Sequence, residues 1–309
     1  MNTVPGTPPE TSPGANPFGT LKTWFLASRP KTLWAAISPV IIGTAMAYSD
    51  NAMHLTSALA ALFGAIMIQI ATNFANDYYD YVLKADNSNR KGPLRVTQAG
   101  LVKPCTMRRA FIITYGIAAL AGIYLISRGG RPVVIIGLAS IIAGILYTGG
   151  PLPYGYVGLG EVFVLLFFGL AAVGGTYYVQ TLAINKVILI AGLGPGLLSV
   201  AVLTVNNLRD LDSDKKAKKK TLAVRFGAAF ARMEYVISVV AGCTIPLALF
   251  LITGRHRLCL LTLLIVLPAI PCIKTVFISN SGEELNRVLA ITGKFLFLFS
   301  ILFSLGWIL

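Results

Sequence analysis

Two segments of this sequence carry carboxylates and carboxamides at helical spacing. In the first segment, polar residues recur at i, i+4, i+7, i+8 and i+11, which is one face of a helix, and they are Gln69, Asn73, Asn76, Asp77 and Asp80. The segment ends a long apolar run, where polar side chains are costly and usually face a polar cavity. A helix end emerging into water would account for Asp80, but Gln69 and Asn73 lie two to three turns deeper. We therefore interpret this face as functional.

The second segment repeats the arrangement. Asn206, Asp210 and Asp214 step by four residues along one helical face, and the Asn-x3-Asp offset is the same as that from Asn76 to Asp80. Two acidic helix ends brought together repel one another strongly in a partly dry site. A divalent cation removes this conflict, and oxygen ligands with a phosphate partner are the preference of Mg²⁺. The two segments therefore predict one Mg²⁺ site assembled from two helices.

Basic residues follow both acidic segments. Arg90 and Arg95 come after the first segment, and Arg225 comes after the second, together with a run of lysines at 215–220. A guanidinium group suits planar, bidentate phosphate contacts better than an ammonium group does, so the arginines are the sharper candidates. The lysine run is equally well explained as a signal for membrane orientation. Carboxylates, a cation and arginines at the mouth of an apolar helix bundle indicate a site for a diphosphate.

The elements that must position these residues are helices that cross a membrane. Of the 309 residues, 55% are hydrophobic and only 12% are charged, which excludes an ordinary soluble domain. Apolar stretches of roughly 17–25 residues are long enough to span a bilayer as helices. There are nine of them, at 32–49, 55–81, 108–127, 132–149, 158–180, 187–208, 233–253, 258–278 and 288–309. Because only helices or closed barrels satisfy their backbone at that depth, the predicted fold is an all-α polytopic membrane protein of nine transmembrane helices.

The distribution of charge predicts the orientation of these helices. The chain has 26 Lys and Arg against 12 Asp and Glu, a net charge of +14. The charges lie in short gaps between apolar runs and not on one basic face, so a nucleic-acid partner is excluded. With a cytoplasmic N-terminus, 21 of the 26 basic residues fall inside, and the five outside are Arg128, Arg131, Lys186, Arg255 and Arg257. This asymmetry predicts a cytoplasmic N-terminus and polar site, with the C-terminus on the outer side.

The domain organisation follows from the polar loops. The loops after the second and sixth predicted spans are long and carry both signs of charge, and four helices separate them. This spacing indicates two related four-helix units plus one final helix. Residues 1–20 contain five prolines and no apolar run, so we expect a disordered tail ahead of one transmembrane domain at 21–309. Four cysteines without CxxC spacing and only two histidines form no zinc or haem pattern.

The two acidic segments and their flanks resemble the UbiA superfamily of membrane prenyltransferases. The matching motifs are Asn76-Asp77-x2-Asp80 with Asp86 and Arg90-Lys-Gly-Pro-Leu-Arg95, then Asn206-Asn207-x-Arg209-Asp210-x3-Asp214 with Lys219-x-Thr221-Leu-x-Val-Arg225-x-Gly227. Supporting segments are 28–33, 147–148, 153–161 and 292–294. Within the superfamily, the sequence is most similar to the dihydroxynaphthoate polyprenyltransferases of menaquinone synthesis. The resemblance covers nearly the whole chain after residue 20.

This resemblance implies a Mg²⁺-dependent enzyme of the bacterial inner (cytoplasmic) membrane. The enzyme transfers a polyprenyl group from polyprenyl diphosphate to 1,4-dihydroxy-2-naphthoate, with release of CO₂ and diphosphate, giving demethylmenaquinone. Membrane lipid is its surrounding partner. The implied Mg²⁺ ligands are Asn76, Asp80, Asp86, Asp210 and Asp214, with Asp77 in support, and Asn76, Asp80 and Asp214 are the catalytic set. The implied diphosphate residues are Arg90, Arg95, Lys219 and Arg225. Candidates for the aromatic substrate are Tyr147, Tyr154, Tyr156 and Gln180.

Two alternatives stay open at this level. A UbiA-type enzyme could instead use another aromatic acceptor, such as hydroxybenzoate, homogentisate or haem. A transporter for an anionic aromatic compound or a lipid diphosphate could also use repeated helix units and polar residues. For the tyrosines at 147–156, an interfacial aromatic belt is a stronger explanation than a substrate pocket. For an enzyme, the prenyl tail must leave sideways between helices into lipid, at a position that the sequence does not show.

Overall fold

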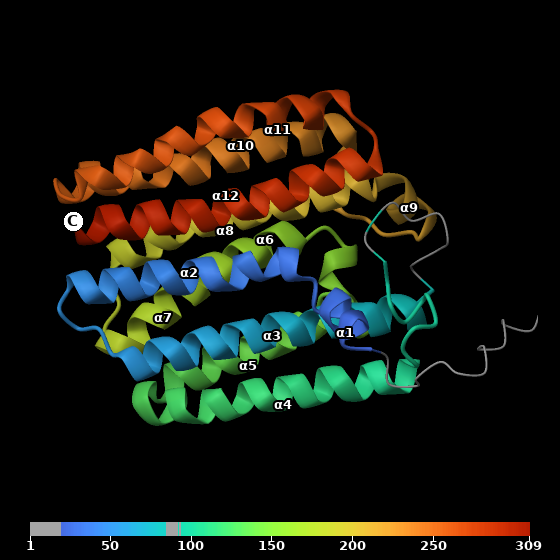
Figure 1. Ribbon diagram of the computed structural model, residues 1–309, viewed down its shortest axis with the longest axis horizontal. Helices are drawn as coiled ribbons and strands as arrows, with labels where there is room; N and C mark the ends of the chain where they lie inside the picture. Colours follow the sequence, from blue (N-terminus) through green and yellow to red (C-terminus); the bar gives the residue numbers. More distant parts are fainter. Residues whose placement is uncertain (1–19, 85–91, 93) are drawn as a thin grey trace, which may run out of the picture.

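The computed structural model describes residues 20–84, 92 and 94–309. Within this part of the chain every regular element is a helix, and the long helices lie side by side in one bundle (Figure 1), which confirms the predicted all-α fold. The elements are α1 (Leu21–Ser28), α2 (Pro30–Ser49), α3 (Leu55–Val82), α4 (Pro104–Gly129), α5 (Arg131–Leu146), η1 (Tyr154–Tyr156), α6 (Gly160–Val164), η2 (Leu165–Ala171), α7 (Ala172–Thr181), α8 (Lys186–Arg209), α9 (Leu211–Lys216), α10 (Leu222–Thr253), η3 (Arg257–Ile265), α11 (Val266–Ile278) and α12 (Gly282–Ile308). The predicted tail lies, apart from Thr20, outside the described residues.

Each predicted span coincides with a helix, but the count of nine complete spans is not confirmed. Eight helical segments of the described chain are long and apolar enough to cross a membrane. The segment predicted at 132–149 is α5, which has only 16 residues. The helix ends early because Pro151 and Pro153 follow it, and proline removes a backbone donor and disfavours helix in the residue before it.

One helix begins much earlier than its apolar pattern indicates. The span predicted at 233–253 is the end of α10, which starts at Leu222. Thr221 caps this helix, because its hydroxyl accepts a hydrogen bond from the Val224 N–H at 3.3 Å. Within the helix Gly227 has φ +87°, a backbone conformation that glycine adopts without steric cost, and the helix kinks there. The hydropathy pattern did not indicate the first part of α10 because this part contains charged residues.

Helix α8 lies at the centre of the bundle. It is the most buried of the candidate spans, and it packs against α10, α12 and η2. Small residues allow the closest of these approaches, since a Cβ added at Gly192 would lie only 2.9 Å from the Gly169 carbonyl oxygen of η2. Helices α2 and α12 also pack together, so the first and last long helices are neighbours (Figure 1).

Both polar segments reach the same end of the bundle. α3 carries Asn76, Asp77 and Asp80 in its last turns, and α8 ends at Arg209, where Asp210 is the C-cap before the short helix α9. α1 and α9 mark this end in Figure 1. The segment between α5 and α6, which contains η1, lies at the same end and contacts the turn between α9 and α10, where the Lys220 N–H donates a hydrogen bond to the Tyr156 carbonyl at 2.6 Å. The fold therefore brings the two halves of the sequence to one place.

Candidate active site

A cavity of about 570 Å³ runs through the middle of the bundle. Its walls are mostly apolar, and α2, α3, α4, α5, α7 and α8 all contribute to them. Its polar end is at the meeting point of the two acidic segments, where Asn76, Asp80, Arg95, Asp210 and Asp214 line it. A cavity of this size, apolar with a few convergent polar groups, is typical of a small-molecule site.

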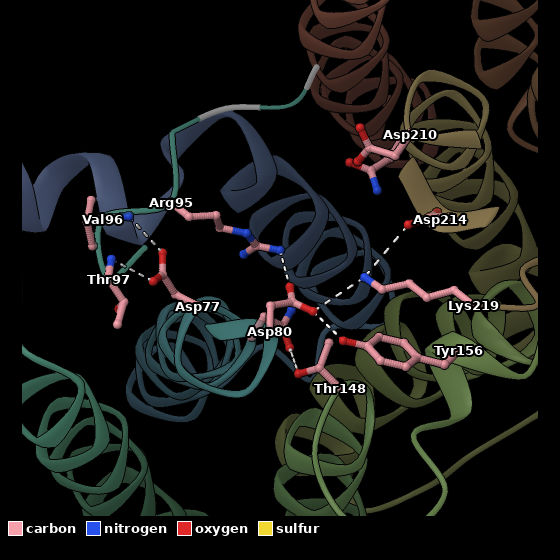
Figure 2. Close-up of polar contacts among 12 residues, drawn as sticks. Asp77, Asp80, Arg95, Val96, Thr97, Thr148, Tyr156, Asp210, Asp214 and Lys219 are labelled. Atoms are coloured by element: carbon pink, nitrogen blue, oxygen red, sulfur yellow. Dashed lines mark hydrogen bonds and ion pairs between the residues drawn. The ribbon is translucent and has the colours of Figure 1, made fainter. Parts of the chain in front are cut away.

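Asp80 is the centre of the polar end. Its side chain is only 1% exposed, and three groups donate to its carboxylate (Figure 2). Arg95 donates from Nη2 to Oδ2, and the Tyr156 hydroxyl donates to Oδ1. Lys219 Nζ lies 3.4 Å from Oδ1. A buried carboxylate of this kind is stable only because cations and hydrogen-bond donors compensate its lost hydration.

Lys219 joins the two acidic segments. Its ammonium group also lies 3.7 Å from Asp214 Oδ1 and 4.3 Å from the centre of the Tyr156 ring (Figure 2). The ammonium group thus lies between carboxylates contributed by the two halves of the chain. The positive charge of Lys219 reduces the repulsion between the carboxylates of Asp80 and Asp214.

The donor chemistry of this end fits Mg²⁺. Asn76, Asp80, Asp210 and Asp214 all line the cavity and present only oxygen ligands, as hard divalent cations prefer. The Asn76 side-chain oxygen accepts a hydrogen bond from Thr148 Oγ1 at 2.8 Å, which fixes the direction of the amide. Across the described ranges, no three His, Cys, Asp or Glu side chains are gathered into a tight metal-binding group. The ammonium group of Lys219 instead provides the positive charge between the carboxylates.

Asp77 supports the site from outside the cavity. Its two carboxylate oxygens accept hydrogen bonds from the backbone N–H groups of Val96, at 3.2 Å, and Thr97, at 3.0 Å (Figure 2). These bonds hold the segment that carries Arg95 against the end of α3. Asp77 therefore positions a neighbouring cation, which agrees with a supporting role and not with a place at the cavity.

Asp210 is held by a network that the sequence did not reveal. Arg209 donates to both of its carboxylate oxygens, from Nε at 2.9 Å and from Nη2 at 2.6 Å. The same guanidinium group donates to Asn206 Oδ1 at 2.8 Å and to Asn286 Oδ1 at 2.7 Å. Asn286 belongs to α12, about 80 residues further along the chain, so no local spacing indicates its contribution.

Glu161 is a further buried acid beside the site. Its Oε1 accepts a hydrogen bond at 2.8 Å from Nδ2 of Asn207, whose side chain lines the cavity. Glu161 lies in the first turn of α6. The sequence contained a signal for this residue, because Glu161 ends the segment 153–161 that supports the family resemblance. That resemblance did not indicate a role for Glu161.

The structure places the remaining predicted residues in different ways. Tyr147, Tyr154 and Tyr156 line the cavity near its polar end. Tyr154 stacks on Phe163 with ring centres 4.1 Å apart, and its burial raises the pKa of its phenol above the ordinary value, so the hydroxyl stays protonated. Asp86 and Arg90 lie outside the described residues.

Arg225 and Gln180 do not join the polar cluster. Arg225 is exposed, and it donates to the backbone oxygens of Val157, at 2.7 Å, and Lys220, at 3.0 Å, so it ties two loops together. Gln180 Oε1 accepts from the His54 N–H at 3.4 Å, and His54 caps the start of α3. Asp80 is 26 residues along the same helix, about 39 Å at 1.5 Å per residue. Gln180 thus lies at the opposite end of the bundle from the acidic residues.

The bundle has the same fold as solved structures of UbiA homologs. It matches a UbiA homolog from Archaeoglobus fulgidus bound to GPP and Mg²⁺ with a TM-score of 0.66 and 18% identity, covering 93% of this chain and 99% of that one. It also matches the apo structure of a UbiA homolog from Aeropyrum pernix K1, with a TM-score of 0.66 and 15% identity over 89% and 96% of the two chains. These likenesses define the class of fold.

The sequence comparisons identify the family. Residues 36–307 match the model of the UbiA prenyltransferase family, and the chain belongs to this family. A protein of Haemophilus influenzae named 1,4-dihydroxy-2-naphthoate octaprenyltransferase is 39% identical over 93% of this chain and 96% of its own length. An Escherichia coli protein of the same name is 40% identical over 77% of this chain and 79% of its own length. The sequence resemblance is thereby confirmed.

Proposed function

We propose that this protein transfers a polyprenyl group from polyprenyl diphosphate to 1,4-dihydroxy-2-naphthoate, with loss of CO₂ and diphosphate, to give demethylmenaquinol, the hydroquinone form of demethylmenaquinone. The observation that carries the proposal is the junction of both acidic segments, through Asp80, Lys219 and Asp214, at the end of a long apolar cavity. The names of the relatives that cover most of the chain support the choice of acceptor.

The polar end is suited to the leaving diphosphate. Breaking the allylic C–O bond places negative charge on the diphosphate oxygens, and preorganised cations stabilise that charge as it develops. Arg95 and Lys219 already lie within contact distance of Asp80, and they provide this positive charge at the mouth. Asn76, Asp80, Asp210 and Asp214 would hold Mg²⁺, which when bound supplies further charge stabilisation to the phosphate oxygens. We include three flanking residues in this proposal: Asp86 as a further Mg²⁺ ligand, and Arg90 and Arg225 as further contacts of the diphosphate. For Arg225, a diphosphate contact would require its side chain to leave the backbone oxygens of Val157 and Lys220.

The walls beside the polar end are suited to the reacting carbon. An allylic carbon that develops positive charge needs surroundings that exclude water, and the faces of aromatic rings attract cations. Tyr147, Tyr154 and Tyr156 line this region together with Phe163 and Phe167. Because Tyr154 stays protonated, its hydroxyl can donate a hydrogen bond to an anionic acceptor without adding negative charge. These aromatics form the proposed contact surface between prenyl donor and naphthoate.

We place the polar end on the cytoplasmic side of a bacterial inner membrane, with the N-terminus inside and the C-terminus outside. The support is the distribution of Lys and Arg, of which the run at 215–220 lies beside the acidic residues. Both proposed substrates carry negative charge, so a mouth on that side meets the naphthoate directly and the diphosphate head at the membrane surface.

Acceptor competition with the purified protein tests the proposal. With one prenyl diphosphate and equal amounts of dihydroxynaphthoate and hydroxybenzoate, we expect the prenylated naphthohydroquinone, which air oxidises to the quinone, as the main product and one diphosphate released per product. If hydroxybenzoate is prenylated and the naphthoate is not, the proposed acceptor is wrong and hydroxybenzoate takes its place. If an anionic substrate enters vesicles that contain the protein and no diphosphate is released, the protein is a transporter and not an enzyme.

A further inference from the structure

We propose that Gly122 of α4 and Gly137 of α5 keep the half of the cavity remote from the acidic residues open for long prenyl chains of the donor. The proposal rests on the proposed function, since it concerns the donor of that reaction. It adds the two residues that determine which chain lengths are accepted.

The cavity is long and continues far from its polar end. Its lining includes Asp80, near the end of α3, and also Val133, near the start of α5, and Val179, near the end of α7. From Val133 to Tyr147, both in the lining, the chain advances 14 positions, about 21 Å along a helix axis. Such a channel is too long for the diphosphate and aromatic ring alone, and it leads away from the charged end.

The remote half offers mainly apolar contacts. In the described lining, charged residues are confined to the polar end, where α2 begins and α3 and α8 end. Two hydroxyls of the walls are already bonded within their own helices, since Ser140 donates to the Ile136 carbonyl at 2.8 Å and Ser199 to that of Pro195 at 2.8 Å. An occupant of this space gains free energy chiefly by burying hydrocarbon, which is the chemistry of an isoprenoid chain.

Two glycines leave the walls of this half open. Gly122 is four residues after Ala118 and seven after Tyr115, which are both buried, so it belongs to the inward face of α4. Gly137 is in the same phase on α5, four residues after buried Val133 and seven before buried Gly144. Both glycines line the cavity, and a Cβ added at either one meets no neighbouring atom within 4 Å.

Elsewhere on the same face, glycine has a different purpose. A Cβ at Gly144 would lie 2.5 Å from the Thr72 hydroxyl oxygen, so this glycine allows close packing of α3 against α5. At Gly122 and Gly137 there is no such neighbour, and the missing side chains leave unfilled volume. Ile123 and Leu138 line the same volume while 63% and 56% exposed, so the wall formed by α4 and α5 is not covered by further helices. A long chain reaches the lipid here.

Donor competition between variants tests this assignment. Gly122→Leu and Gly137→Leu add bulk to the channel, and Gly116→Leu is the matched control, since Gly116 is exposed on the same helix, lies outside the cavity lining and also has open space at its Cβ. Each full-length variant is purified and kcat/KM is measured with geranyl diphosphate and with an eight-unit prenyl diphosphate. We expect the ratio of kcat/KM for the long donor to that for the short donor to fall about tenfold or more in both channel variants. The reason is that the leucine side chain would occupy volume that the long chain fills, and overpacking of this kind costs that much. Turnover of the short donor should stay within about twofold of the unmodified protein, and the control should change neither value.

An unchanged ratio in the channel variants, or an equal fall in Gly116→Leu, overturns the inference. Should the leucine variants fail to fold, as measured by Tm, the double variant with alanine at positions 122 and 137 decides the matter, and an unchanged ratio in that protein also overturns it. Failure of the proposed function is a separate result, because the unmodified protein would then make no prenylated naphthoate from either donor.

Discussion

Replacement of Asp80 by asparagine separates the chemistry of the site from its stability. The amide keeps the shape of the carboxylate but removes its charge, which Arg95, Tyr156 and Lys219 now contact. Hydrogen bonds to charged groups contribute about 1.5–3 kcal/mol each, and breaking a buried pair from one side costs about 3–5 kcal/mol. Because Lys219 keeps Asp214 at 3.7 Å, we expect a loss near the lower end, about 3 kcal/mol, and a folded bundle.

Turnover should fall much further than stability. If Asp80 is both a metal ligand and the anchor of two cations, Asp80→Asn should lose at least a thousandfold in turnover, about 4 kcal/mol of transition-state stabilisation. The assay is diphosphate release with dihydroxynaphthoate and a prenyl diphosphate, paired with the unfolding transition. Asp77→Asn is the matched control, since Asp77 is buried in the same turn but bonds to backbone N–H groups outside the cavity. The control should destabilise the protein comparably while losing only about tenfold in turnover.

Turnover of Asp80→Asn within tenfold of the unmodified protein, with the same Mg²⁺ dependence, would contradict both roles of Asp80. An equal loss of turnover in the two variants would also contradict them, because a common loss would reflect folding alone.

Four further predictions follow from other contacts. Tyr156→Phe keeps the ring beside Lys219 but removes the donor to Asp80, so kcat should fall about tenfold with little change in Tm; an unchanged kcat would contradict this. Asn286→Leu removes one partner of Arg209, and both turnover and affinity for Mn²⁺, measured by electron paramagnetic resonance, should decrease, whereas Asn286→Asp should restore them in part. Chelation of divalent cations should abolish turnover and added Mg²⁺ should restore it, while activity that survives chelation would exclude the metal. Because burial raises the folded-state pKa of Tyr154, the protonated phenol stabilises the fold below about pH 10 and this stability is lost at higher pH; Tm should therefore fall less steeply above pH 10 in Tyr154→Phe.

Helical periodicity predicted the parts of this molecule that depend on local sequence. Each apolar run coincides with a helical segment, and the four-residue steps of Asn76, Asp80, Asp210 and Asp214 selected polar groups that do line one cavity, although Asp210 is the C-cap of α8 and Asp214 belongs to α9. The pattern failed where charge and glycine interrupt a helix. α10 begins at Leu222, ahead of its apolar run, and includes Arg225 and Gly227. α5 is shorter than its apolar run because prolines follow it.

Contacts between distant segments were beyond any local pattern. Only the family resemblance distinguished Lys219 from the other lysines of its run, and the turn after α9 is what brings it between Asp80 and Asp214. Asn286 reaches Arg209 from α12, and Arg225 turns back onto the backbone oxygens of Val157 and Lys220. Gln180 stood in an apolar span like Gln69, but its helix ends on the far side of the bundle. Direction along a helix axis, and not polarity, decided which of these residues reach the site.

The fate of the naphthoate carboxyl group decides whether the prenyl group replaces the carboxylate. Dihydroxynaphthoate labelled with ¹³C in the carboxyl group is incubated with a prenyl diphosphate, Mg²⁺ and the purified protein, and the product, CO₂ and diphosphate are quantified together. We expect labelled CO₂, diphosphate and an unlabelled prenylated product in equal amounts. A prenylated product that retains the label, or consumption of the donor without any prenylated naphthoate, would contradict the proposed reaction.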